Sequence, residues 1–510
     1  MTKIESSFTE DLLNKEESQK MVKAVSILHL VSISFFYVCA GPFGQGEAIA
    51  AGGAKWTFIF TFLVPIVFSV PLALISSEQS SRLPACGGCA EWGLILGQFV
   101  GVLNAYVRFL CSVFDNPIYP CMIADYLVHF IPQIDKLGYR FLISIVSNAI
   151  VLAINISGLE TVGSVSFILA IVIIAPFLLF FAFGASEMTP EKVFADKPKK
   201  YGPVNWSLMV STLIWQYSGF DTVSALSEET KNPKRTFPIA LFITIVIVIL
   251  VYILPTISGL SVEPDLEKWA SGAFSDISKK LPHCSNGWLG YWISVAGILS
   301  GLSMLNIAIS CTGRETYAGA LLDAFPLSNY LSRLHNNVKK EPLPIISLAF
   351  MSVITIPFTL FDFSILVEWS GLLTVIQQLI QVAAYIALRF PSMVQKMKKN
   401  QEILRARVEA VEISNIDDSE HEDAESKDVI NEDLSDKFIV PGGWLGVAVV
   451  CVPITAISIF LCVVAGWMSL VISAAMVAGM FLLKAIERGT KMLVSKCERK
   501  NVKEEAEASP

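Results

Sequence analysis

The sequence predicts an all-α protein that crosses a lipid bilayer many times. Of the 510 residues, 53% are hydrophobic and only 16% are charged, whereas soluble proteins carry about 25% charged residues. Apolar stretches recur along most of the chain. At about 20 residues, each is long enough for a helix to cross a hydrocarbon core of roughly 30 Å. A large soluble protein with buried helices is the alternative, which this composition disfavours.

Twelve transmembrane helices are predicted from the order of these stretches. The first, third and eighth are too long for a plain crossing, so we expect them to be tilted, broken or extended beyond the bilayer. The predicted spans cover residues 24–51, 56–80, 96–131, 140–156, 161–184, 207–230, 237–260, 287–321, 343–361, 364–390, 442–464 and 467–488.

The distribution of lysine and arginine predicts the orientation of the chain. Basic clusters lie at 231–235, 332–340 and 395–407 and in the C-terminal tail. With these clusters inside and an even number of spans, both termini are expected in the cytoplasm. The plasma membrane is the expected location.

The spans also define the predicted domains. The segment between spans 10 and 11 is acidic and poor in aromatic residues, which is typical of a disordered loop. It is interpreted either as a binding segment for a cytoplasmic partner or as a solvated connection. The predicted parts are a tail at 1–23, five spans at 24–184, five spans at 207–390, the acidic loop at 391–440, two spans at 441–488 and a tail at 489–510.

Two spans contain helix-breaking residues at related positions. Span 1 is interrupted by Gly41-Pro42-Phe43-Gly44, and span 6 by Ser218-Gly219-Phe220, five spans later. Unpaired backbone groups in lipid are unfavourable, so such breaks persist where protein or a water-lined cavity satisfies them. Breaks at matching positions in two halves predict inverted repeats with a substrate site near the middle of the membrane.

Three carboxylates lie near these breaks or at similar depth. They are Glu47 after the first break, Asp115 in span 3 and Asp221 after the second break. A charged side chain at the bilayer centre costs roughly 2.5–3.5 kcal/mol even on the lenient insertion scale. We therefore expect these groups to contact a substrate. Asp115 and Glu47 are also the candidates for carrying a coupled proton, since burial raises the pKa of a carboxyl.

Each carboxylate also has a purely structural interpretation. Asp221 could cap the second half of helix 6 by accepting backbone N–H bonds. Glu47 could be stabilised by the dipole in the first turn of the second half of helix 1. Asp115 could form an ion pair with Arg108, seven residues earlier on nearly the same helical face.

Aromatic residues cluster at the same places. A ring beside a carboxylate suits an organic ammonium, which gains cation–π attraction as well as charge pairing. Packing in the core or against lipid is the alternative for any single ring. The predicted substrate-binding aromatic residues are Phe43, Tyr119, Trp215, Tyr217 and Phe220.

Glu228 and Glu229 end span 6 just before Pro233, which stops the helix. They are predicted to form an inner gate by pairing with basic residues at 231–235. A solvated helix end is the alternative.

Motifs of soluble enzymes are missing from the sequence. It contains no Walker A sequence, no HExxH and no GxSxG in a strand–turn–helix context. We therefore expect no enzyme activity, cofactor, metal or nucleic-acid partner. Transport would be driven by an ion gradient or be passive.

Several stretches together resemble the amino acid–polyamine–organocation superfamily, most closely its plant and protozoan polyamine uptake transporters and its light-subunit amino acid transporters. They are "AGPFGQGEAIAAGG" (40–53), "VFDNPIYPCMIADYL" (113–127), "GFDTVSALSEETKNPKRTFPIAL" (219–241) and "FIVPGGWLG" (438–446). The resemblance extends over about residues 24–488. It implies a leucine-transporter-like fold of two inverted five-helix repeats plus two helices, alternating access, and proton-coupled uptake of polyamines or amino acids.

The resemblance also implies substrate contacts at Gly41, Phe43, Gly44, Asp115, Tyr119, Ser218, Gly219 and Asp221. The sequence departs from the family pattern at three places. A single acid, Glu47, follows GPFG where the plant-like pattern has two. Gln381 stands where a carboxylate is expected in helix 10, and helix 5 lacks the lysine that some proton-coupled relatives use.

The expected function is a proton symporter that imports polyamines or other cationic amines. An amino acid needs a site for its carboxylate as well as for its ammonium. A polyamine needs anionic and aromatic surroundings, which the acids of helices 1, 3 and 6 fit better. A proton-coupled amino acid transporter is the first alternative, and a nutrient sensor without transport on the same fold is the second.

Overall fold

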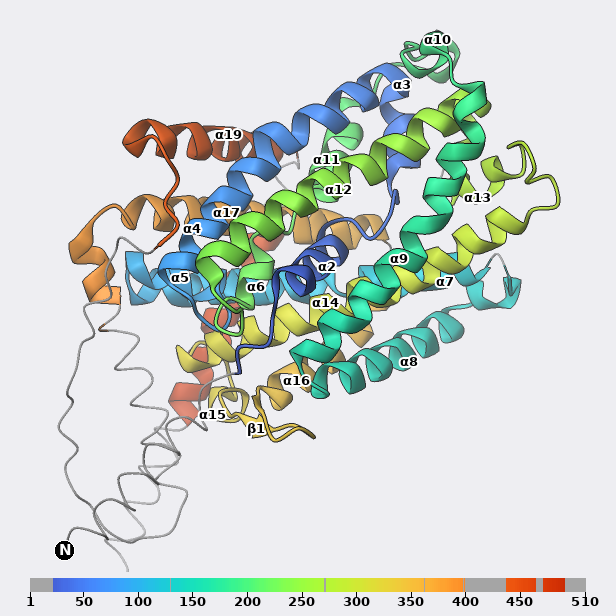
Figure 1. The fold of residues 1–510 in the computed structure, drawn as a ribbon. Coiled ribbons are helices and arrows are strands. Elements are labelled where there is room, and N and C mark those ends of the chain that lie inside the picture. The colour runs from blue at the N-terminus through green and yellow to red at the C-terminus, as the bar shows by residue number, and fades with distance from the viewer. Residues whose placement is uncertain are drawn as a thin grey trace, which may run out of the picture.

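The computed structural model of the protein is a bundle of helices that run alongside one another (Figure 1). Most of the predicted acidic loop and of both predicted tails lies outside the described residues. The structure describes residues 22–128, 130–269, 272–361, 363–397, 399, 437–464 and 471–490.

The first half of the chain forms helices joined by short turns. These helices are α2 (Ile27–Val38), α3 (Gln45–Val64), α4 (Val70–Arg82), α5 (Cys89–Trp92), α6 (Gln98–Asp115), α7 (Ile118–Val128), α8 (Leu137–Ile156) and α9 (Leu159–Gly184). Shorter 3-10 or π turns lie at η1 (Pro65–Ser69), η2 (Gly93–Leu96) and η3 (Pro132–Asp135).

The connection to the second half holds η4 (Ala185–Glu187), α10 (Pro190–Val193) and η5 (Lys199–Tyr201). The second half contains the one short strand pair of the described residues, β1 (His335–Asn336) with β2 (Pro342–Leu343). Its helices are α11 (Trp206–Gln216), η6 (Thr222–Ala225), α12 (Pro233–Val262), η7 (Leu266–Lys268), α13 (Ala273–Ser278), α14 (Trp288–Leu321), α15 (Ser328–Leu331), α16 (Ile345–Ile354), η8 (Ile356–Leu360) and α17 (Phe363–Ala387), followed by α19 (Gly443–Val464).

Among the described residues, seven helices are long and apolar enough to cross a membrane. This number does not test the predicted twelve spans, because shorter apolar helices such as Ile27–Val38 and Ile345–Leu360 accompany them. The seven are Gln45–Arg82, Leu137–Ile156, Leu159–Glu187, Pro233–Val262, Trp288–Leu321, Ile365–Ala387 and Gly443–Val463.

Helix α14 lies in the middle of the bundle, where it packs against α6, α7, α9 and α16 (Figure 1). By contrast, α8 and α9 expose large apolar side chains such as Ile145, Ile168 and Ile171 on the outside. An apolar outer surface on long apolar helices is what a lipid environment requires. We call the end of the bundle with α10 and α13 the α10 end, and the opposite end, with α5 and α15, the α5 end (Figure 1).

The first predicted break is present between α2 and α3. Glycine permits the backbone found there, with φ of 139° at Gly41 and 82° at Gly44. Ser300 of α14 donates a hydrogen bond to the Ala40 carbonyl, so a neighbouring helix satisfies a backbone group that the break leaves free. The first and second predicted spans are separated by a turn at Gly53, where φ is 78° and ψ is 171°.

The second predicted break follows α11, and Gly219 adopts a φ of 101° there. The expected second half of helix 6 is not an α-helix. Only the single turn η6 forms, and an irregular segment of turns and bends then leads to α12. Its backbone bonds instead with neighbouring segments, since Gly87 N–H donates to the Ala225 carbonyl at 3.1 Å and Lys231 N–H to the Val25 carbonyl at 2.9 Å. These bonds replace those that a helix would have made.

Candidate functional site

A cavity of about 770 Å³ lies where both breaks, α6, α7, α14 and α17 meet. Asn205, just before α11, and residues 272–274 of α13 line it toward the α10 end. Arg108 and Thr222 line it in the direction of the α5 end. Most of the predicted site residues also line it, namely Phe43, Gly44, Glu47, Asp115, Tyr119, Trp215, Ser218, Gly219 and Asp221.

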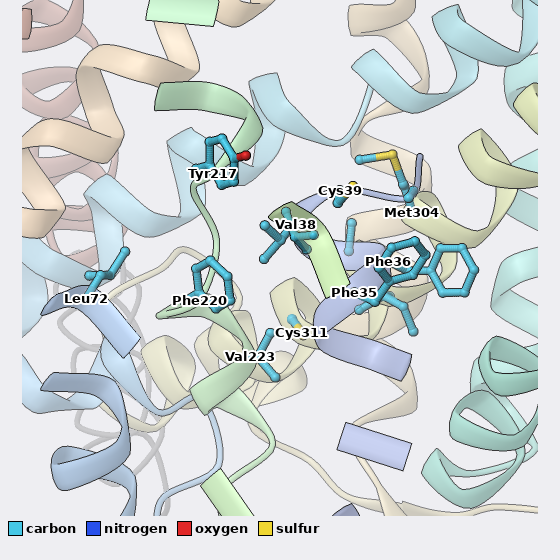
Figure 2. Packing of buried hydrophobic residues seen from close by; sticks show 14 of the residues in the cluster. Phe35, Phe36, Val38, Cys39, Leu72, Tyr217, Phe220, Val223, Met304 and Cys311 are labelled. Carbon is cyan, nitrogen blue, oxygen red and sulfur yellow. The ribbon is translucent and has the colours of Figure 1, made fainter. Parts of the chain in front are cut away.

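Three predicted site residues do not line this cavity. Figure 2 shows Tyr217 and Phe220 among the buried hydrophobic side chains, and both are almost fully buried. The backbone leaves the helix between them, so their rings point into the core rather than along the cavity wall. The Tyr217 hydroxyl donates to the Thr61 carbonyl at 3.0 Å. Gly41 shapes the break, since a Cβ there would lie 2.4 Å from the Phe43 ring.

Asp115 stands at the end of α6, directly before α6 gives way to α7. Its Oδ2 accepts a hydrogen bond of 2.8 Å from the Tyr119 hydroxyl, one turn along the chain. The predicted alternative, an ion pair with Arg108, is wrong, because Arg108 binds two other carboxylates. No lysine or arginine of the described residues pairs with Asp115, so its charge faces the cavity without a cation.

Glu47 lies in the first turn of α3, as the sequence predicted. That position favours a carboxylate, because the free N–H groups of a helix start carry partial positive charge. Its Oε2 atom is buried and has no hydrogen-bond partner among the described residues. Gln216, at the end of α11, donates from Nε2 to the Phe43 carbonyl at 2.9 Å and so links the two breaks.

Asp221 does not cap the turn that follows it, and the capping interpretation is therefore wrong. Its Oδ2 instead lies 3.4 Å from Nη1 of Arg108, which extends from α6. The Nη2 of Arg108 donates to the Thr222 hydroxyl at 2.8 Å and also to Glu315 of α14. These four residues, which we call the floor of the cavity, join α6, η6 and α14. Glu315 lies behind Arg108 and does not itself line the cavity.

A model of the amino acid permease family matches residues 24–464. The chain belongs to the amino acid permease family. It is therefore a multi-pass membrane protein of a permease family rather than an enzyme.

Individual relatives of this permease are named as transporters. Polyamine transporter RMV1 of Arabidopsis thaliana is 32% identical over 285 residues, which cover 56% of this chain and 57% of that protein. Polyamine transporter PUT1 of Oryza sativa subsp. japonica is 30% identical over 284 residues, covering 55% and 52%. The aspartate-proton symporter of Bacillus subtilis (strain 168) is 22% identical over 317 residues, covering 58% and 60%. The chain thus spans a little over half the length of these relatives.

Beyond the floor, a second buried ion pair lies toward the α5 end. Glu229 binds Arg314 of α14, with 3.0 Å between Oε2 and Nη2. The predicted partners at 231–235 are therefore wrong for Glu229, and so is the solvated helix end, because Glu229 is only 3% exposed. Glu228 accepts a bond of 2.9 Å from the Cys86 N–H. The two acids hold the irregular chain after η6 against α14 and the loop before α5.

Sequence reasoning missed Glu315 and Arg314 and did not assign Arg108 to the site. All three are charged residues within apolar helices, a signal that by itself marks functional positions in membrane proteins. It also missed Lys197, whose Nζ donates to the carbonyls of Ala50 and Ala51 at 2.9 and 3.1 Å, at the end of the half-helix before Gly53. Lys197 stands between α10 and α11, where sequence patterns carry no such signal.

Proposed function

We propose that this permease is a secondary transporter that moves polyamines or other cationic amines across a membrane by alternating access, with protons as the coupling ion. The main support for this proposal is that Asp115 and Glu47 face one cavity and that no lysine or arginine of the described residues pairs with either. A bound ammonium would offset their unfavourable charge at bilayer depth.

The surroundings of these carboxylates also suit an amine. Phe43, Tyr119 and Trp215 line the same cavity, and their ring faces attract cations. The volume of about 770 Å³ lies within the range of small-molecule sites, roughly 300–1,000 Å³. Two of the relatives are named polyamine transporters, which supports the same substrate class.

The finer architecture belongs to this proposal. We propose twelve spans in two inverted repeats, with one repeat beginning at α2 and the other at α11. Support comes from the breaks that follow α2 and α11, five predicted spans apart. We also propose the plasma membrane as the location, with both termini and the α5 end facing the cytoplasm.

Amino acids remain the second candidate substrate, because Arg108 lines the cavity and a guanidinium can bind a carboxylate. Against this, both of its terminal nitrogens already donate, to Asp221, Thr222 and Glu315. These bonds use three of its five N–H groups, and the two acids already offset the guanidinium charge. A substrate carboxylate would be repelled by these acids, whereas an ammonium meets unpaired carboxylates directly.

The test is uptake of radiolabelled putrescine, spermidine, arginine and leucine into proteoliposomes that contain the purified chain. We expect uptake of the two polyamines and its loss in Asp115→Ala. The matched control is Asp276→Asn, which removes a carboxylate whose side chain is 70% exposed. Leucine uptake that survives Asp115→Ala, with no polyamine uptake in the wild type, would reject the amine proposal.

The same vesicles test the coupling. An imposed pH gradient should drive amine uptake, and an imposed sodium gradient should not. Uptake driven by acid outside supports the symport expected from the sequence, and uptake driven by acid inside supports exchange. Amine binding without flux would favour a sensor.

A further inference from the structure

The floor of the cavity holds two carboxylates and one guanidinium. The side chains of Asp221, Glu315 and Arg108 are 2%, 3% and 5% exposed, so the protein must balance their charges internally. Arg108 is the cation that reaches both acids, and it can neutralise one of them. When both acids are ionised, the floor therefore carries one net negative charge.

Glu315 is the acid of this group that a substrate cannot reach. Asp221 lines the cavity, whereas Glu315 lies behind Arg108 and does not. Its Oε1 accepts from Arg108 and, at 3.4 Å, from the Cys89 thiol of α5. Its Oε2 is buried and has no hydrogen-bond partner among the described residues. A buried carboxylate oxygen without a donor is unfavourable, and protonation relieves that situation.

Other charged and titratable groups also surround Glu315. Its remaining titratable neighbours among the described residues are Tyr37 of α2, Cys111 of α6 and Cys311, one turn earlier on α14. Arg314 is adjacent in sequence, but it is paired with Glu229. Arg108 is thus the cation that balances Glu315, and it is shared with Asp221.

We propose that Glu315 is the proton-binding residue of this transporter and that Arg108 is the positioning residue that makes the proton compete with the amine. The inference rests on the proposed function, since it requires a cation in the cavity. With Glu315 protonated, Arg108 balances Asp221 and the floor is neutral. With Glu315 ionised, the floor is negative and attracts an ammonium at Asp221.

The coupling step involves one O–H bond. As the ammonium enters, the carboxylic acid of Glu315 loses its proton to the solution that the open cavity faces, and Arg108 becomes its counter-ion. No oxidation or other covalent change is needed. Because coupling between two binding sites is reciprocal, acid must weaken amine binding as much as the amine favours proton release. The transporter would therefore exchange substrates: an amine moves in one direction and a proton moves in the other.

This assignment differs from the expected proton carriers, Asp115 and Glu47. Those two carboxylates face the cavity, where the ammonium itself can replace a proton as their partner. Glu315 does not line the cavity, so the ammonium does not contact it directly. Its protonation responds to the substrate through the shared arginine.

The test measures amine affinity and proton release with the purified full chain. Spermidine binding is determined from mildly acidic to mildly alkaline pH, and released protons are counted with an indicator dye in weak buffer. For the wild type we expect affinity to rise with pH by about tenfold, a typical coupling, and protons to be released on binding. Glu315→Gln mimics the protonated acid, so its affinity should stay at the weak level at all pH values, without proton release.

Two further variants make the result specific. Glu47→Gln is the matched control, and it should bind more weakly while keeping the pH dependence and the proton release. Asp221→Asn leaves Arg108 to Glu315 alone, so proton release should fall here too. This second variant serves if Glu315→Gln does not fold. Proton release that persists in Glu315→Gln, or that disappears only in Glu47→Gln, overturns the inference while the amine proposal stands. A wild type that binds no amine rejects both.

Discussion

At the residue scale, the cavity acids differ in how the protein holds them. Asp115 is oriented by a hydrogen bond from Tyr119, within one helical turn. Asp221 is held by Arg108, whereas a Glu47 oxygen has no protein donor. An incoming ammonium therefore meets one oriented acid at Asp115, one acid already paired at Asp221 and one unsatisfied acid at Glu47.

The oriented acid gives the first residue-scale prediction. Asp115→Asn should weaken putrescine binding by about 10- to 100-fold, because a hydrogen bond to a charged group contributes about 1.5–3 kcal/mol. The melting temperature should change little, since no ion pair is lost. Equilibrium binding and thermal unfolding of the purified protein measure the two effects. Tyr119→Phe is the companion variant and should lose less affinity, because the carboxylate remains. Wild-type affinity in Asp115→Asn would contradict the proposed contact.

At the element scale, the broken helices turn backbone groups toward the cavity while neighbouring helices satisfy the others. Ser69 of η1 donates to the Tyr217 carbonyl at 2.9 Å, and Gln216 donates to the Phe43 carbonyl at 2.9 Å. The two breaks are thus tied to one another and to the helix that follows the first break. A change in the backbone at one break should therefore alter the backbone position at the other.

Gly44 offers the test of this connection. Its φ is 82°, and an added Cβ would lie 2.7 Å from Nε2 of Gln216. Gly44→Ala should therefore destabilise the protein by roughly 1–2 kcal/mol, the cost of a left-handed non-glycine residue, and should weaken amine binding by displacing Gln216. Thermal unfolding and binding measurements check both effects.

The matched control is Gly138→Ala in α8, where an added Cβ meets nothing within 4 Å. Alanine is a better helix former than glycine, so this variant should be as stable as the wild type or more so. Equal losses in Gly44→Ala and Gly138→Ala would argue against a special role for the backbone at Gly44.

At the scale of the whole molecule, the sequence predicted the class of fold and the location of the cavity for physical reasons. Long apolar stretches can only be helices in lipid, and glycine within them marks a break. The partners of charged residues did not follow from the sequence. Arg108 was assigned to an acid seven residues away, yet its partners lie 113 and 207 residues along the chain. Spacing along a helix predicts which nearby residues can be partners of a charged side chain. Tertiary packing determines which distant residues become its partners.

The irregular backbone limited prediction in the same way. Helical periodicity places a side chain only while the chain stays helical, and Tyr217 and Phe220 lie where it does not. Their rings were expected in the cavity and lie in the core. The chain after η6 was expected to be helical and instead bonds with distant segments. Residues in and after a break are thus the ones whose surroundings depend most on the rest of the molecule.

The buried ion pair toward the α5 end yields the last prediction, which concerns global stability. Glu229 and Arg314 are a buried ion pair, with side chains 4% and 1% exposed. Removing one partner leaves an uncompensated buried charge, so Glu229→Gln should lower the free energy of unfolding by about 3–5 kcal/mol. The double variant Glu229→Gln with Arg314→Met removes both charges and should recover most of that loss. Denaturant unfolding of the four proteins, including Arg314→Met alone, measures the coupling. If the losses of the two single variants simply add in the double variant, the two side chains do not stabilise the protein through each other.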